Sequence, residues 1–127
     1  MSAENFEFNS KLDIDFLKSI YEDDNEHAQI VFEKFMQTIG PQLNELEESY
    51  TSGSAEIFRK KIHTIKPVFS FVGLTGLTHK AEMIEKKIME ASGVNMVHEL
   101  FTAFKNELYQ MIPVIENDLT KLKALTL

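Results

Sequence analysis

Apolar residues recur at steps of three or four along almost the whole chain, and this spacing most constrains the fold. The clearest run lies between Ser54 and Gly73 and consists of Phe58, Ile62, Ile65, Phe69 and Val72. An α-helix turns by about 100° per residue, so residues at this spacing share one face of a helix. Because almost no segment alternates as a strand does, the sequence predicts an all-α protein.

Four other segments are expected to be helical. A short first helix should begin after Asp13 as its N-cap and stop at the acidic cluster Glu22–Asp24. Longer helices are expected over residues 25–50, over a segment after Gly73, and from about Asn95 toward the C-terminus. The residues predicted to be buried are Ala28, Val31, Phe35, Ile39, Leu43, Leu46 and Tyr50, then Leu77, Ala81, Ile84 and Ile88, and finally Val97, Phe101, Phe104, Leu108, Met111, Ile115, Leu119 and Leu122.

Turn-forming residues separate these segments. Ser54 is expected to cap the third helix, Gly73 and Gly76 to bracket a tight turn, and the segment 92–94 to form the next turn. Pro113, and Pro41 together with the preceding glycine, predict bends inside the long helices, because proline lacks the donor of the helical hydrogen bond.

Long amphipathic helices joined by short polar loops favour antiparallel neighbours. We therefore predict an antiparallel up-and-down four-helix bundle, with the short additional N-terminal helix packed across one end. A chain of 127 residues can bury one substantial core. Residues 1–12 are expected to be a flexible N-terminus and residues 13–127 a single domain.

Composition argues against several classes of function. The formal net charge of −7 is unfavourable for binding nucleic acid or an anionic membrane, because both require clustered basic residues. The chain has no cysteine, so a disulfide framework, a thiolate nucleophile and a cysteine-based zinc site are all excluded. The first ten residues lack the pattern of a secretory signal, and a cytoplasmic protein is expected.

His63 lies on the polar side of the third helix. In helical projection it is roughly 140° from the centre of the apolar stripe, and Arg59, Lys66, Pro67 and Ser70 fall within about 60° of it. An exposed histidine on a rigid helix is available for chemistry. Imidazole is largely neutral at cellular pH and is a good nucleophile toward phosphorus.

Other chemistries find less support in the spacing of residues. Di-iron bundles place a Glu three residues before a His, and none of the four histidines has a Glu at that offset. His79 and Glu82 share a helix face, but two ligands make a weak metal site. Gly73 and Gly76 are not followed by the Lys and Ser or Thr of a phosphate-binding loop.

The stretch HTIKPVFSFVGLTGLTHKAEMIEKK, which begins at His63, resembles the histidine-containing phosphotransfer (HPt) domain of multistep two-component phosphorelays. That family's pattern has a phosphoacceptor His, a Lys three residues later, a small residue, a Gly, and then an apolar and an acidic or amide residue. Those places are held here by His63, Lys66, Pro67, Gly73, Ile84 and Glu85.

The resemblance implies a phosphorelay intermediate. His63 would accept a phosphoryl group from a receiver-domain aspartate and pass it to another receiver, while Lys66 would stabilise the added charge. The protein would itself be no enzyme and hold no cofactor, since Mg²⁺ is expected in the partner receiver domain. The expected partners are response-regulator receivers and a hybrid histidine kinase, bound by a monomer. The candidates for docking are Arg59, Thr64, Pro67, Val68, Ser70, Phe71 and Lys80.

Pro67 departs from the family pattern, which usually has Gly there. A proline at this position cannot donate to the carbonyl of His63, so the helix is expected to bend or loosen beneath the histidine.

Two alternatives from other classes stay open. The chain could be a helical interaction module that docks on a receiver or kinase without carrying phosphate, although the presence of His63 and Lys66 argues against it. It could also be an enzyme or metal protein that uses the bundle core.

Overall fold

The structure of the chain is a computed structural model, which describes residues 6–91 and 97–125. The described part of the chain contains five α-helices and no strand. The helices are α1 (Ile14–Tyr21), α2 (Asn25–Thr51), α3 (Ala55–Ser70), α4 (Thr75–Ala91) and α5 (His98–Leu125). The prediction of an all-α protein is therefore confirmed.

Side-chain caps explain where the first three helices begin. Asp13 Oδ1 accepts a hydrogen bond from the Phe16 amide at 3.1 Å, and this bond starts α1. Asp24 caps α2 in the same way, and the hydroxyl of Ser54 accepts from the Ile57 amide at the start of α3. Capping side chains satisfy amides that have no partner within the helix. The predicted caps at Asp13 and Ser54 are confirmed.

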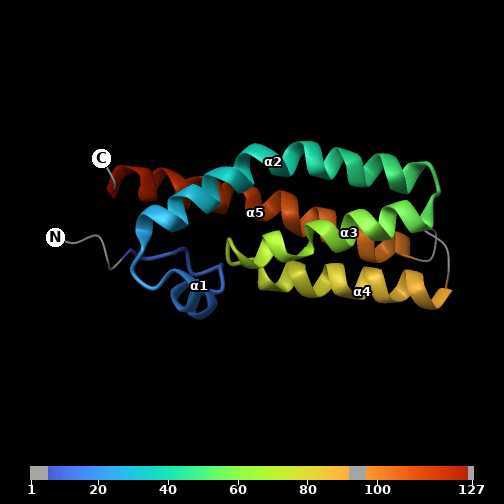
Figure 1. The fold of residues 1–127 in the computed structure, drawn as a ribbon, viewed down its shortest axis with the longest axis horizontal. Helices are drawn as coiled ribbons and strands as arrows, with labels where there is room; N and C mark the ends of the chain where they lie inside the picture. The colour runs from blue at the N-terminus through green and yellow to red at the C-terminus, as the bar shows by residue number, and fades with distance from the viewer. Residues whose placement is uncertain (1–5, 92–96, 126–127) are drawn as a thin grey trace.

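The four longer helices lie side by side along the long axis of the molecule, and α1 lies at the end where α2 begins (Figure 1). α2 packs against α3 and α5, and α4 packs against the same two helices. Each long helix thus has two neighbours in a helical bundle. Within the described ranges, no helix is both long enough and apolar enough to cross a membrane.

The core is formed by most of the predicted apolar residues, with exceptions in α2 and α5. The stripe residues Phe58, Ile62, Ile65 and Phe69 of α3 are buried, as are Val72, which follows this helix, and the four residues predicted in α4. In α2, however, Phe32 is fully buried while Val31 is only partly buried. Phe32 packs against Phe8, with ring centroids 5.7 Å apart. Phe32 lies four residues after Ala28 and three before Phe35, so it also fits the helical spacing of the buried face. Tyr50 and Met111 are also only partly buried.

The packed part of the chain begins before residue 13, where the sequence placed the domain boundary. Phe8 and Leu12 are buried in the core. The amide of Asn9, which lies between them, donates to Asp118 Oδ2 of α5 at 2.8 Å. Apolar side chains in an otherwise polar N-terminal segment therefore attach residues 6–12 to the bundle.

Glycine shapes the turn between α3 and α4, but only at one of the two predicted positions. Gly73 has a φ of +81°, which other residues rarely adopt. Gly76 instead lies in the first turn of α4. The turn predicted over residues 92–94 and the helix start predicted near Asn95 lie outside the described residues.

The three prolines all lie inside helices, at position 41 in α2, 67 in α3 and 113 in α5. Each of the three helices continues through its proline, so α3 extends beyond Pro67 to Ser70. Pro67 nevertheless lacks the amide that would donate to the His63 carbonyl.

Candidate functional site

His63 lies in the middle of α3 with its side chain 65% exposed. Its neighbour in sequence, Ile62, is fully buried, as is Phe58 one turn earlier. The stripe that holds α3 in the core therefore directs His63 outward, and the exposure expected from helical projection is observed. The imidazole is held on a packed helix and remains open to solvent.

Glu85 of α4 contacts this imidazole. His63 Nδ1 lies 2.6 Å from Glu85 Oε2, and only 12% of the Glu85 side chain is exposed. α3 and α4 pack together along their length, and a hydrogen bond of 2.7 Å joins the hydroxyls of Ser70 and Thr78 farther along the same contact. Helix packing thus determines which nitrogen of His63 meets the carboxylate.

Lys66 binds the other oxygen of the same carboxylate. Its Nζ lies 3.0 Å from Glu85 Oε1, and its side chain is 22% exposed. His63 and Lys66 are therefore brought together through a residue of the next helix. The group consisting of His63, Lys66 and Glu85 is called the His63 site below.

The pKa of Glu85 is lowered by this arrangement. Burial acts to raise the pKa, but hydrogen bonds from Lys66 and His63, together with their charges, outweigh the cost of burial. The carboxyl group is consequently ionised near neutral pH, and an ionised carboxylate can only accept hydrogen bonds.

The proton shared with Glu85 must then belong to His63 Nδ1. In the neutral imidazole, a proton on Nδ1 leaves the lone pair on Nε2. Because the side chain is mostly exposed, Nε2 is the nitrogen available to an incoming electrophile. The carboxylate thus selects one tautomer of the histidine, as an acidic residue does in hydrolytic triads.

The predicted docking residues differ in their surroundings. Thr64 and Pro67 are exposed, whereas Val68 is partly buried and packs against the core. The Arg59 side chain is 26% exposed and forms an ion pair with Glu56 at 3.2 Å. Arg59, Thr64 and Pro67 lie within about one helical turn of His63.

The remaining docking candidates have other structural contacts. The hydroxyl of Ser70 is bound to that of Thr78, and the carbonyl of Phe71 accepts a hydrogen bond of 2.6 Å from the Tyr21 hydroxyl. The Phe71 side chain is exposed. Lys80 forms an ion pair of 2.8 Å with Glu107 of α5.

Sequence reasoning placed Glu85 within a pattern but assigned it no role. The spacing from His63 to Glu85 carries no contact information until the turn at Gly73 brings the two helices together. An acidic residue beside the buried Ile84 was the only local signal, and helical geometry places such a residue at the edge of the core.

Within residues 6–91 and 97–125, no group of three or more His, Asp or Glu side chains is arranged to hold a metal ion. His79 and Glu82, the pair considered from the sequence, lie 3.5 Å apart, and both side chains are mostly exposed.

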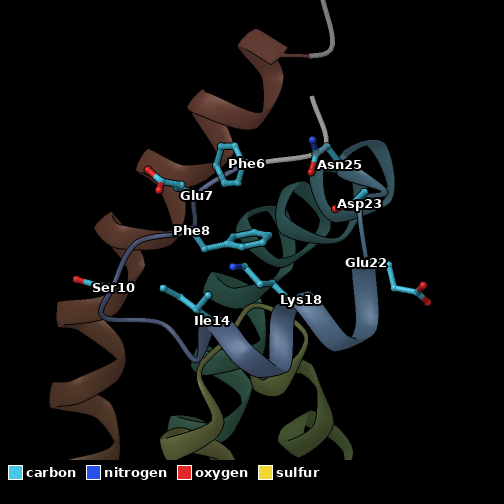
Figure 2. A pocket seen from close by; sticks show the side chains of 9 residues that line it. All are labelled: Phe6, Glu7, Phe8, Ser10, Ile14, Lys18, Glu22, Asp23 and Asn25. Carbon is cyan, nitrogen blue, oxygen red and sulfur yellow. The ribbon is translucent and has the colours of Figure 1, made fainter. Parts of the chain in front are cut away.

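A pocket of about 650 Å³ beside α1 is separate from the His63 site. Its lining residues are Phe6, Glu7, Phe8, Ser10, Ile14, Lys18, Glu22, Asp23 and Asn25 (Figure 2). The carboxyl groups of Glu7 and Glu22 lie on opposite sides of this pocket in Figure 2. Its charged groups therefore do not converge on one point, as they do at the His63 site.

Comparisons of the chain with family models, with curated proteins and with solved structures gave no match.

Proposed function

We propose that this protein is a phosphorelay intermediate of the HPt type, which accepts a phosphoryl group on His63 from a receiver-domain aspartate and transfers it to another receiver. The observation that carries the proposal is the contact between His63 Nδ1 and the largely buried Glu85 carboxylate at 2.6 Å. It leaves an exposed, unprotonated Nε2 as a nucleophile on a rigid helix.

The bonds formed and broken in the transfer balance without a further reactant. The Nε2 lone pair attacks phosphorus, so an N–P bond forms while the bond between phosphorus and the aspartyl oxygen breaks. The aspartate leaves as a carboxylate, and the proton stays on Nδ1, from which it is donated in the hydrogen bond to Glu85. In the second transfer the N–P bond breaks as the carboxylate of the next receiver attacks phosphorus, and the neutral imidazole is restored.

Lys66 and Glu85 have complementary roles in this mechanism. The positive ring that forms on phosphorylation is stabilised by the Glu85 carboxylate. The phosphoryl group adds a charge of up to about −2 by analogy with other phosphorylated side chains, and Lys66 can neutralise part of it. Because a phosphoryl group on the exposed His63 remains hydrated, its attraction to Lys66 is screened by water, so Lys66 tunes the transfer and does not determine it.

The partners are response-regulator receivers and a hybrid histidine kinase, and the receiver supplies the aspartate and the Mg²⁺ that phosphoryl transfer requires. The chain acts as a monomer in the cytoplasm. Its architecture is an antiparallel up-and-down four-helix bundle with α1 packed across one end. This assignment is supported by the neighbours of each long helix.

The test is transfer from receivers of the source organism that have been phosphorylated with acetyl phosphate and Mg²⁺. The wild-type protein should acquire an acid-labile phosphate, and His63→Gln should acquire none. His79→Gln is the matched control, because His79 is another exposed histidine that lies beside a glutamate. Normal labelling of His63→Gln would exclude the mechanism. Binding to a receiver without labelling of the wild type would favour the interaction module.

A further inference from the structure

The charges of this acidic protein are distributed unevenly. Residues 55–91, which form α3, α4 and their turn, carry seven basic and four acidic side chains, so their formal net charge is +3. The whole chain has −7, with −5 in residues 1–24 and −4 in α2. The His63 site therefore lies on a segment of positive net charge in an acidic chain.

Most acidic side chains of this segment form ion pairs with basic side chains of the same segment. Glu85 is bound by His63 and Lys66, and Glu56 lies within 4 Å of both Arg59 and Lys60. The remaining acidic residues are Glu82, which pairs with His79, and Glu90, which lines a groove with Met83 and Lys86.

Two lysines extend the positive charge around His63. The Lys60 side chain is 67% exposed and lies about 60° from His63 around the α3 axis, one turn before it. Lys86 is exposed on α4 and directly follows Glu85, the residue that contacts the imidazole. Lys86 forms no ion pair with any residue that the structure describes. Exposed basic side chains are therefore present on both helices that carry the His63 site.

We propose that the exposed face of α3 and α4, centred on Lys60, His63 and Lys86, steers the phosphodonor to the site through electrostatic attraction. This inference rests on the proposed function, and its occupant is the anionic, Mg²⁺-binding face of a phosphorylated receiver. Such a face must be rich in carboxylates, because Mg²⁺ binds oxygen ligands, and the phosphoryl group adds further negative charge.

The negative charge on the rest of the molecule also favours approach of an anionic partner toward the His63 site. An anionic face is repelled by the acidic N-terminal segment and by α2, and this repulsion disfavours docking at sites remote from His63. Steering of this kind acts mainly on the association rate and weakens as salt screens the charges, with a Debye length of about 8 Å at physiological ionic strength.

The experiment compares Lys60→Gln/Lys86→Gln with Lys11→Gln/Lys34→Gln, a control that removes two exposed lysines from outside residues 55–91. Each protein receives phosphate from the fastest-donating receiver of the source organism, which has been phosphorylated with acetyl phosphate and Mg²⁺. Rapid-mixing kinetics give the second-order transfer rate at low and at high salt.

Lys60→Gln/Lys86→Gln should transfer about fivefold more slowly than wild type at low salt and equally fast at high salt, with the final phosphohistidine level unchanged. The control should match wild type. Equal rates for both double variants, or equal slowing of both, would overturn the inference while labelled His63 upholds the proposed function. Failure of every receiver to label the wild type would overturn both.

Discussion

At the residue scale, the His63 site combines an exposed nucleophile with a nearly buried carboxylate. Glu85 is bound from two sides, by His63 at 2.6 Å and by Lys66 at 3.0 Å. A largely buried carboxylate held by two donors favours the tautomer that carries its proton on Nδ1. Glu85 is thus a positioning residue, since it acts on the reacting nitrogen through the other side of the ring.

Replacing Glu85 should change the tautomer of His63 while the fold is retained. In Glu85→Ala the two tautomers become mixed, and the phosphotransfer rate should fall about 10-fold or more, as for lost partners of metal-bound histidines. Glu85→Gln keeps an oxygen acceptor and should retain more activity. ¹⁵N NMR of His63 measures the tautomer directly, and an unchanged spectrum in Glu85→Ala would contradict the role given to Glu85.

The lowered pKa of Glu85 makes part of the folding free energy depend on pH. Burial raises this pKa and the bonds from Lys66 and His63 lower it, with a net decrease. A depressed carboxyl pKa stabilises the folded state above the pKa of the unfolded chain, and this contribution is lost as pH falls through the folded pKa.

Urea unfolding between about pH 3 and pH 6 tests this linkage. The loss of stability in acid should be smaller in Glu85→Gln than in wild type, because the variant has no carboxyl group to protonate. Glu82→Gln, a change of a half-exposed glutamate on the same helix, is the control and should follow the wild-type curve. Identical curves for all three proteins would show that Glu85 is not the linked group.

At the element scale, the turn between α3 and α4 determines whether Glu85 can reach His63. α1 holds this turn at several points. The Asp13 amide donates to the Gly73 carbonyl at 2.8 Å, and Asp13 Oδ2 accepts from the Thr75 hydroxyl at 2.9 Å. The Tyr21 hydroxyl, whose pKa is raised by burial, donates to the Phe71 carbonyl. The short first helix therefore stabilises the turn that aligns the site.

Gly73→Ala should destabilise the protein more than Gly53→Ala. Both glycines have a positive φ, which costs about 1 to 2 kcal/mol for alanine. A Cβ at Gly73 would also lie 2.8 Å from Leu17 Cδ1 and 2.9 Å from the Leu12 Cβ, whereas one at Gly53 meets nothing within 4 Å. The clash should add about 1 to 3 kcal/mol.

Denaturant unfolding of the two glycine variants isolates the clash, because the cost of positive φ is common to both. A difference near zero would mean that α1 shifts without penalty. Gly73→Ala should also slow phosphotransfer, since repacking of the turn disturbs the contact between Glu85 and His63.

At the scale of the whole molecule, one buried carboxyl group links the two ends of the chain. Asp118 of α5 is fully buried, and its Oδ2 accepts the Asn9 amide. Its Oδ1 has no hydrogen-bond partner among the described residues. Burial raises the pKa of Asp118, against the lowering effects of the Asn9 amide and the charge of Lys121.

This raised pKa predicts a loss of stability as pH rises. The unfolded chain ionises Asp118 at the lower, ordinary pKa, so its stabilising contribution is lost as pH rises through the higher folded pKa. Asp118→Asn keeps an oxygen acceptor for the Asn9 amide and has no group to ionise. Urea unfolding from about pH 4 to pH 7 should show that the stability of wild type relative to Asp118→Asn falls as pH rises, because the linkage of Glu85 is common to both proteins. A stability difference that does not change with pH would contradict the assignment.

The sequence by itself determined the helical class, the caps at Asp13 and Ser54, the buried stripe of α3 and the exposure of His63. These features depend on residues a few positions apart, and helical geometry relates such neighbours directly. Residues far apart in the sequence required the tertiary structure. Only packing showed that Glu85 binds both His63 and Lys66.

The same distinction explains the differences from the prediction. Phe32 packs against Phe8, and the Asn9 amide donates to Asp118 of α5. Helical spacing places both Val31 and Phe32 beside the buried face of α2, and only the packed core shows that Phe32 is the more buried residue. The attachment of residues 6–12 joins groups far apart in the sequence, so no local pattern indicates it. The spacing of apolar residues therefore determined where the nucleophile points, whereas the packing of α3 against α4 decided which of its nitrogens is free to react.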